Sequence, residues 1–166
     1  MITAAFGVAA LFLVILLVHP SPPLLSTGTA APAIVLKSDT GQRLDVLAVA
    51  AHHPVVVEFF EESCVSCQQD AQTLCAASNA FPEVTVVAVD AGGAPASALQ
   101  TFATKYLTPP CHVTVLVDPS QRAAHDYQAA VVPTVYVIDS NRKISYGGVG
   151  ASGIHGVAAA LRRLNA

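Results

Sequence analysis

Residues 55–67 read VVVEFFEESCVSC, and this stretch decides the fold class. Its first six residues are β-branched or aromatic except for Glu58, which is typical of a strand buried on both faces of a sheet. Residues 64–80 then contain no Gly or Pro and have the composition of a helix. The segment therefore predicts a buried strand, a Cys-x-x-Cys pair where the strand ends, and a helix that begins at the pair.

Strands and helices alternate through the rest of the chain. Further strands are predicted at 84–90, 112–118, 134–139 and 143–148, and helices at 95–107, 119–128 and 153–164. Two short apolar runs around the turn Asp39-Thr40-Gly41 predict a hairpin over 34–47. Strands separated by helices pair in parallel through crossovers, whereas hairpins add antiparallel strands. We expect an α/β domain in three layers with a mixed central sheet.

The chain begins with an apolar run, residues 2–18, interrupted only by Thr3 and Gly7. As a helix the run would be about 25 Å long, which just reaches across the hydrocarbon core of a membrane. Residues 1–18 are therefore predicted to be a transmembrane anchor or a cleaved signal segment. Residues 19–33, with four prolines, indicate an extended tether, and 34–166 form the domain. Either reading places this domain outside the cytoplasm.

Charge and cysteine content exclude some functions. The chain has eight Lys and Arg against eleven Asp and Glu, a net charge of −3, and no basic stripe. Binding to nucleic acid through phosphates is therefore not expected. All four cysteines lie in the exported part, where an even number favours disulfides over metal ligands.

The pair Cys64 and Cys67 has the position that disulfide exchange needs. A cysteine at a helix N-terminus meets free N–H groups and the positive end of the helix dipole, which stabilise the reactive thiolate. Cys67 lies one turn further along and can close on a mixed disulfide at Cys64. Half of a zinc site has the same spacing, but Cys75, Cys111 and His112 do not supply the second half. No metal is expected.

The order of motifs resembles the TlpA/ResA-like thiol–disulfide oxidoreductases of the thioredoxin superfamily, whose domain is of the AhpC/TSA-redoxin type. The resemblance is carried by VVVEFFEESCVSC, by VVPTVYVID around Pro133, and by the closing VGASGIHGVAAALRRL, and it runs from about residue 31 to 166. An additional helix and strand (95–118) before the proline fits this group. The resemblance implies a thioredoxin fold with an N-terminal hairpin and with this additional helix and strand inserted before the proline.

The resemblance also implies roles for individual residues. Cys64 would be the attacking thiol and Cys67 the resolving one. Pro133 would be the cis-proline that faces the sulfurs, with Val132 offering its backbone to an extended substrate. Glu58 would be the buried acid behind the pair, and burial in an apolar strand would raise its pKa and let it exchange a proton with Cys67.

The sequence departs from the usual pattern beside the nucleophile. Ser63 stands where a Trp is usual, and the residues between the cysteines are Val65 and Ser66. These three residues are expected to contact substrate together with Val132, and they bear on substrate preference and redox potential.

Cys75 and Cys111 have no role in this predicted active site. Eleven residues of helix carry Cys75 about 16 Å away from Cys64, towards the end of the sheet where a strand following Cys111 would start. A structural disulfide between them is one reading, and two separate buried thiols are the other.

The predicted function is that of an exported reductase of protein disulfides. The dithiol would carry the electrons, so no cofactor is needed. A membrane thiol carrier of the DsbD or CcdA type would donate electrons, and disulfide-bearing exported proteins would receive them; in this family these include apocytochrome c. Two alternatives stay open. One is a thiol peroxidase, although FFEESC lacks the Pro-x-x-x-Thr-x-x-Cys pattern; the other is a Sco-like copper-delivering protein, although its Cys-x-x-x-Cys spacing is one residue longer.

Overall fold

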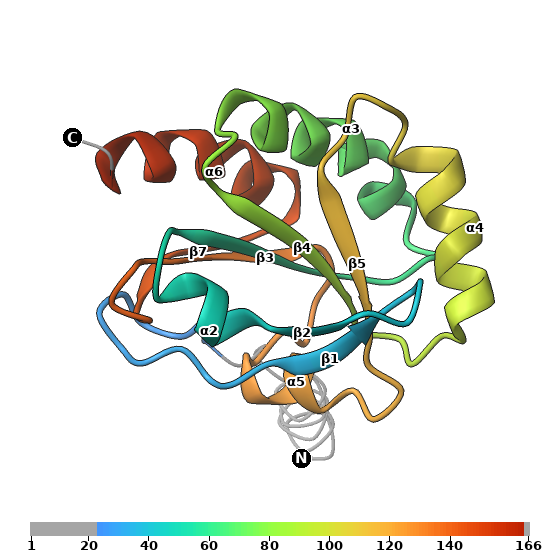
Figure 1. Cartoon of the computed structure of the whole chain (residues 1–166), viewed down its shortest axis with the longest axis horizontal. Helices are drawn as coiled ribbons and strands as arrows, with labels where there is room; N and C mark the ends of the chain where they lie inside the picture. Colours follow the sequence, from blue (N-terminus) through green and yellow to red (C-terminus); the bar gives the residue numbers. More distant parts are fainter. Residues whose placement is uncertain (1–22, 165–166) are drawn as a thin grey trace, which may run out of the picture.

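The computed structural model describes residues 23–164, which form a seven-stranded sheet with helices on both faces (Figure 1). The strands are β1 (Val35–Ser38), β2 (Arg43–Asp45), β3 (Val55–Phe60), β4 (Thr85–Asp90), β5 (Val113–Val117), β6 (Thr134–Ile138) and β7 (Ile144–Val149). The helices are α2 (Val46–Ala50), α3 (Val65–Ala80), α4 (Ala96–Tyr106), α5 (Arg122–Asp126) and α6 (Gly150–Leu164).

The sheet is mixed, in the order β2-β1-β5-β4-β3-β6-β7. The strands β3, β4 and β5 pair in parallel through the crossover helices α3 and α4. The hairpin of β1 and β2 adds one antiparallel edge, and β6 with β7 adds the other. The predicted α/β class, the N-terminal hairpin and the insertion of a helix and a strand before β6 are confirmed. The arrangement is a thioredoxin-like fold.

All six residues of β3 are buried, and their alternation separates two cores. Val57 and Phe59 face one core together with α2 and α5. Val56 and Phe60 face the other, where α3, α4 and α6 pack. Because successive side chains of a strand point to opposite faces, Glu58 shares the second face. This strand therefore carries a carboxyl group into the layer beneath α3.

The residues before β1 lie along the domain. Their main chain bonds to the start of β7, with Gly28 N–H donating to Ile144 O (2.7 Å) and Ala31 N–H donating to Arg142 O (3.0 Å). Tyr136 O–H donates to Tyr127 O, and Tyr127 O–H donates to Pro32 O, each at 2.8 Å. The second half of the segment that the sequence predicts to be a tether is thus held against the sheet.

The predicted span over residues 1–18 and the first residues of the tether lie outside the described residues. Within 23–164, no helix has the length and apolar character needed to cross a membrane.

The predicted hairpin is shorter than expected, because Asp45 accepts a hydrogen bond from Ala48 N–H (3.1 Å) and caps α2, which begins at Val46.

A disulfide joins Cys75 in α3 to Cys111 just before β5, with 4.6 Å between the Cα atoms. Side chains of α3 also bond to the residues just before β5. Asn79 Nδ2 donates to Pro110 O (2.7 Å), and Ser78 Oγ accepts from His112 N–H (3.0 Å). The end of α3 remote from Cys64 is therefore fixed to the start of β5.

We predict that the Cys75→Ser, Cys111→Ser double variant keeps the fold and loses about 4 kcal/mol of unfolding free energy, the value of the chain-entropy model for a loop of this length. Urea unfolding of the oxidised proteins measures the loss, and peptide mapping without reduction should recover Cys75 linked to Cys111. Two freely alkylated thiols at these positions in the native protein would contradict the assignment.

Candidate active site

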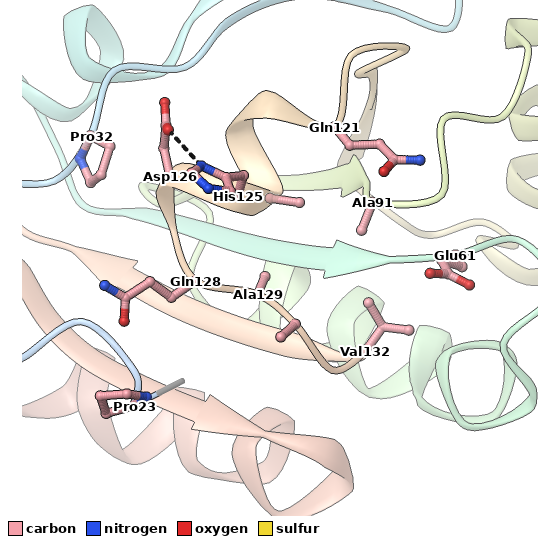
Figure 2. A pocket seen from close by; sticks show the side chains of 12 residues that line it. Pro23, Pro32, Glu61, Ala91, Gln121, His125, Asp126, Gln128, Ala129 and Val132 are labelled. Carbon is pink, nitrogen blue, oxygen red and sulfur yellow. Dashed lines mark hydrogen bonds and ion pairs between the residues drawn. The ribbon is translucent and has the colours of Figure 1, made fainter. Parts of the chain in front are cut away.

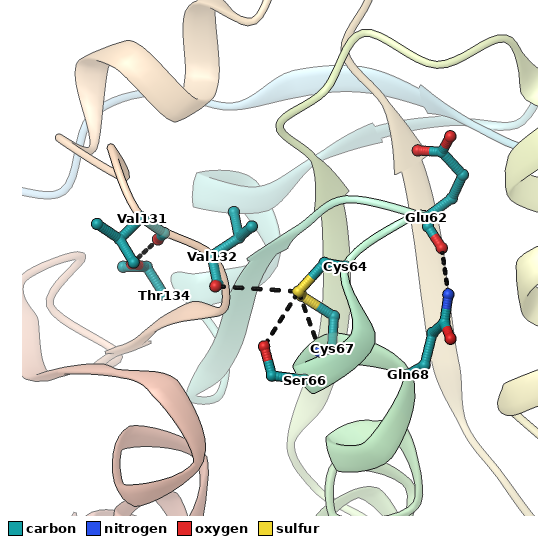
Figure 3. Close-up of a disulfide and its surroundings, with 8 residues drawn as sticks. All are labelled: Glu62, Cys64, Ser66, Cys67, Gln68, Val131, Val132 and Thr134. Atoms are coloured by element: carbon teal, nitrogen blue, oxygen red, sulfur yellow. Dashed lines mark hydrogen bonds between the residues drawn. A yellow bond between two sulfur atoms is a disulfide. The ribbon is translucent and has the colours of Figure 1, made fainter.

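Cys64 occupies the N-cap position of α3, immediately after the loop that leaves β3. It forms a disulfide with Cys67, with 5.2 Å between the Cα atoms. The Cys64 sulfur accepts a hydrogen bond from Cys67 N–H (3.1 Å) and another from the Ser66 hydroxyl (3.2 Å), as Figure 3 shows. A sulfur atom here takes the place of the Ser, Thr or Asp oxygen that usually satisfies a free N–H at a helix start. Both donors would stabilise a thiolate after reduction.

The two sulfurs differ in access. Cys64 is half-buried, whereas Cys67 is only 1% exposed and belongs to the core beneath α3. An incoming disulfide can therefore reach Cys64 but not Cys67. This asymmetry gives the pair one attacking and one resolving position.

The loop before β6 lies against Cys64. The Val132–Pro133 peptide bond is cis, and Val132 O is 3.9 Å from the Cys64 sulfur. The loop is held by Thr134, whose hydroxyl donates to Val131 O (2.5 Å), and by Gly150, whose N–H donates to Pro133 O (2.8 Å). The structure thus brings Cys64 together with Val132 and Pro133, and Val132 is 68 residues away from Cys64 in sequence.

The loop before Cys64 is clamped to α4. Gln68 Nε2 donates to Glu62 O (2.8 Å), and Tyr106 O–H donates to Gln68 Oε1 (3.0 Å). Ser63 and Val65 are exposed on either side of Cys64. In Figure 3 the Glu62 carboxylate points away from the Cys64 sulfur.

Glu58 is 4% exposed and lies behind the pair, on the sheet face that α3 covers. Burial, and to a lesser extent the negative charge of Asp70, raises the pKa of Glu58 from 4.5 to about 8. Its Oε1 atom has no hydrogen-bond partner. The carboxyl is therefore protonated at neutral pH and can exchange a proton at the pH where a thiol does.

Three buried acids were not predicted from the sequence. Asp90 and Asp118, at the carboxyl ends of β4 and β5, accept hydrogen bonds from main-chain N–H groups: Ala94 N–H donates to Asp90 (2.6 Å), and Ala123 N–H in α5 donates to Asp118 (2.8 Å). Each of the two follows an apolar strand directly, and this position is the sequence feature that could have predicted a buried acid there. Asp70 is the third, and its signal was the helical spacing of three residues from Cys67.

Apolar side chains are exposed near Cys64, beside polar residues such as Ser63 and Glu61. Three of the large exposed hydrophobic side chains lie at this end: Val65 (65% exposed), Val131 (43%) and Val149 (39%). A groove of about 960 Å³ starts at Glu61 and Val132 and continues past α5 (Figure 2). Its far end is lined by Pro23 and Pro32. An extended peptide chain fits such a surface better than a small charged molecule does.

Within residues 23–164, no three His, Cys, Asp or Glu side chains gather as a metal site. The histidines 52, 53, 112, 125 and 155 all lie outside the hydrogen bonds of Cys64.

Comparisons with known proteins agree with this geometry. The model of the AhpC/TSA family matches residues 27–147. A putative thiol:disulfide interchange protein DsbE from Chlorobium tepidum is 21% identical over 86% of this chain and 99% of its own, with a TM-score of 0.75. A secreted Mycobacterium tuberculosis disulfide oxidoreductase homologous to E. coli DsbE is 20% identical over 79% and 96%, with a TM-score of 0.67.

Peroxidoxin BcpB from Mycobacterium tuberculosis is 18% identical over 85% of this chain and 97% of its own, with a TM-score of 0.70. At these identities the structures share the fold. No curated protein sequence matches the chain.

We predict that Glu58→Gln stabilises the oxidised protein as pH rises. An acid with a raised pKa binds more protons folded than unfolded between pH 4.5 and about 8, so its contribution to stability declines across this window. The difference in unfolding free energy between the variant and the wild-type protein should therefore be roughly 3 kcal/mol more favourable to the variant at pH 7 than at acid pH. Urea unfolding at about pH 5 and about pH 8 measures the difference, and parallel pH profiles of the two proteins would contradict it.

Proposed function

This chain belongs to the AhpC/TSA family, and we propose that it is an extracytoplasmic protein thiol–disulfide oxidoreductase that reduces disulfides of exported proteins. The observation that carries the proposal is the asymmetric pair at the start of α3, with an accessible Cys64 and a buried Cys67. The DsbE-like structures with the same fold support the same chemistry.

The reaction takes two thiol–disulfide exchanges. The Cys64 thiolate attacks one sulfur of the substrate disulfide, and the other substrate sulfur leaves as a thiolate and takes a proton from solvent. Cys67 then gives its proton to the ionised form of Glu58, which is the minority form at neutral pH because the pKa of Glu58 is about 8, and attacks the Cys64 sulfur. The second substrate thiolate leaves, and the Cys64–Cys67 disulfide remains. Two electrons pass from the dithiol to the substrate, so the chain needs no bound cofactor.

The exposed side chains of Val65, Val131 and Val149 and the main chain of Val132 support a protein as the substrate. The main chain before Pro133 would pair with an extended substrate segment, while Ser63, Val65 and Ser66 contact its cysteine. We include in the proposal a membrane anchor at the N-terminus and a membrane dithiol carrier that reduces the Cys64–Cys67 disulfide again. Apocytochrome c is one substrate class of this kind.

A thiol peroxidase is the second candidate, favoured by the family and by the fold shared with a peroxidoxin. Cys64 would then attack a hydroperoxide and become a sulfenic acid, and Cys67 would condense with it and release water. A peroxide-consumption assay with dithiothreitol as the reductant separates the two functions, because a disulfide reductase consumes insulin disulfides faster than peroxide.

We predict that Cys67→Ser accumulates mixed disulfides with exported proteins, because the thiol that resolves them is absent. Cells producing this variant should yield covalent adducts on non-reducing gels, and mass spectrometry should place the link at Cys64.

The matched control is Cys64→Ser, which keeps a buried thiol at Cys67 and should give no adducts. Insulin reduction should be lost in Cys64→Ser and retained in Cys75→Ser. Adducts of equal yield in both active-site variants would contradict the assigned order of attack.

We predict a reduction potential for the Cys64–Cys67 disulfide closer to that of thioredoxin, about −270 mV, than to that of DsbA, about −120 mV. In the part of the chain that the structure describes, the donors to the Cys64 sulfur are neutral, a main-chain N–H and the Ser66 hydroxyl. Without a cation the thiolate gains less stabilisation, and the reduced state is a stronger reductant. A glutathione or dithiothreitol redox titration measures the potential, and a value near that of DsbA would indicate an oxidase.

A further inference from the structure

The groove beside Cys64 is larger than the exchange steps require. Its volume is about 960 Å³, and it runs from Glu61 and Val132 past α5 to Pro23 and Pro32 (Figure 2). The chemistry of the pair takes place at the sulfur atoms and uses only the end of the groove next to Val132, whose carbonyl oxygen is 3.9 Å from the Cys64 sulfur. The rest of the groove is therefore open to the polypeptide that flanks a substrate cysteine.

The walls of the groove suit a polypeptide main chain. Gln121 and Gln128, at the two ends of α5, are exposed in it, and each side-chain amide can both donate and accept hydrogen bonds. Several of the other lining residues are alanines, whose short side chains leave room for a substrate: Ala91, Ala124, Ala129 and Ala130.

Both ends of α5 have a backbone conformation that residues other than Gly rarely adopt. Gln121, before the helix, and Gln128, after it, each have φ of 55°, in the left-handed region. Arg142 is the third such residue among residues 23–164. Conformations of this kind cost free energy and are concentrated at functional sites. Their presence at two positions that line the groove supports α5 as the wall of a binding site.

Glu61 brings a negative charge to the end of the groove next to Cys64. Its side chain lies against the main chain of Gly92, where an added β-carbon would be 3.2 Å from Glu61 Cγ. Its carbonyl oxygen accepts a hydrogen bond from Cys64 N–H (3.1 Å). These contacts hold Glu61 within one turn of the nucleophile, and Figure 2 shows it at the same end of the groove as Val132.

No cation in the described part of the chain forms an ion pair with Glu61. The other acid of the groove, Asp126, lies beside Arg122 (3.6 Å) and His125 (3.3 Å). Glu61 is thus the acid of this groove whose charge is not neutralised within the domain. A carboxylate in this position is complementary to a cation on the substrate.

Glu62, the next residue, lines a different hollow. That hollow has a volume of about 410 Å³, lies beside α4 and contains a cation of its own, Lys105. Val132 is not among its lining residues. The two neighbouring acids therefore face different surroundings, and only the groove of Glu61 continues to the loop before Pro133, with which a substrate main chain would pair.

We propose that Glu61 is a specificity-determining residue: its carboxylate binds a Lys or Arg side chain of a polypeptide substrate that lies along the groove, close in sequence to the cysteine that Cys64 attacks. This inference rests on the proposed function and narrows its substrates to proteins with a basic residue near the reactive disulfide. Because an extended chain advances about 3.3 Å per residue, two or three residues of substrate span the distance from Cys64 to a side chain one turn away.

The test uses short peptides in which one cysteine forms a mixed disulfide with thionitrobenzoate. The Cys64 thiolate attacks the peptide sulfur, and thionitrobenzoate leaves because its thiol has a low pKa. Cys67 then attacks the Cys64 sulfur and releases the peptide thiol, so two electrons pass from the dithiol to the peptide disulfide. The absorbance of thionitrobenzoate gives the rate constant of the first step. Lys is moved through the positions on either side of the cysteine, with norleucine as the uncharged counterpart.

At the favoured position the Lys peptide should react about fivefold faster than the norleucine peptide. Glu61→Gln should bring this ratio close to one, and Glu61→Lys should reverse the preference in favour of a peptide with Glu at that position. Each ratio compares two peptides on the same protein, so a general change in the reactivity of Cys64 cancels. The matched control is Glu62→Gln, which removes the same charge one residue away and should keep the wild-type ratio.

A second measurement tests the path of the substrate chain. Ala130 is exposed in the groove, so Ala130→Phe should fold and narrow the groove. It should slow the peptides more than it slows the small disulfide dithiobis(nitrobenzoate), which does not extend along α5. Ala98→Phe, in the hollow beside Glu62, is the matched control and should leave the ratio of the two rates unchanged.

A Lys preference that survives Glu61→Gln, or that Glu62→Gln removes to the same extent, overturns the inference, because the preference then comes from the net charge of −3. Equal rates for Lys and norleucine at every position in the wild-type protein overturn it as well. Failure of the proposed function would look different: the reduced protein would release thionitrobenzoate from every peptide no faster than dithiothreitol does, and the function and the inference would fall together.

Discussion

The N–H group of Cys67 donates a hydrogen bond to a sulfur atom, and the rest of the site depends on this interaction. The N-terminus of a helix leaves several N–H groups without partners, and a side chain at the N-cap can satisfy one of them. Here that side chain is Cys64. The group that completes the helix is therefore also the group that reacts, and the orientation of the nucleophile is set by the local folding of α3.

Burial of β3 on both faces supplies the second condition. A strand in the middle of a mixed sheet must be apolar, yet Glu58 occupies its fourth position and is cut off from water. The same desolvation that destabilises the folded protein at neutral pH gives the carboxyl the proton affinity of a thiol. Stability and reactivity are opposed at this residue, which is a common feature of active sites. The apolar layers on either side of the sheet offset the cost.

Local patterns predicted most of the fold. The apolar run before Cys64, the Gly- and Pro-free stretch after it, and the alternation of strands with helices predicted the order of the strands and of helices α3 to α6. Helix α2 was not predicted, because its first residues were assigned to the hairpin. The position of Pro133 beside the sulfurs came from resemblance to a family, because no local rule brings residues so far apart together. Asp70 was missed because a single polar residue in a helix is usually solvent-exposed, and only the packing of α3 shows which side it faces. Residues 19–33 were assigned as a tether from their composition. The bonds of Gly28 and Ala31 to the start of β7, of Leu25 to the Tyr136 hydroxyl and of Pro32 to the Tyr127 hydroxyl depend on tertiary structure.

Helix α3 carries one cysteine of each disulfide, eight residues apart. Complete reduction of the described domain therefore takes up four electrons, while turnover uses two. A measurement of total thiols sums the Cys64–Cys67 and Cys75–Cys111 disulfides, which differ in accessibility. A single reduction potential fitted to that sum describes neither disulfide. Stepwise alkylation with reagents of different mass keeps the couples apart, and the protein that has taken up only two labels is the species whose redox behaviour is relevant to its chemistry.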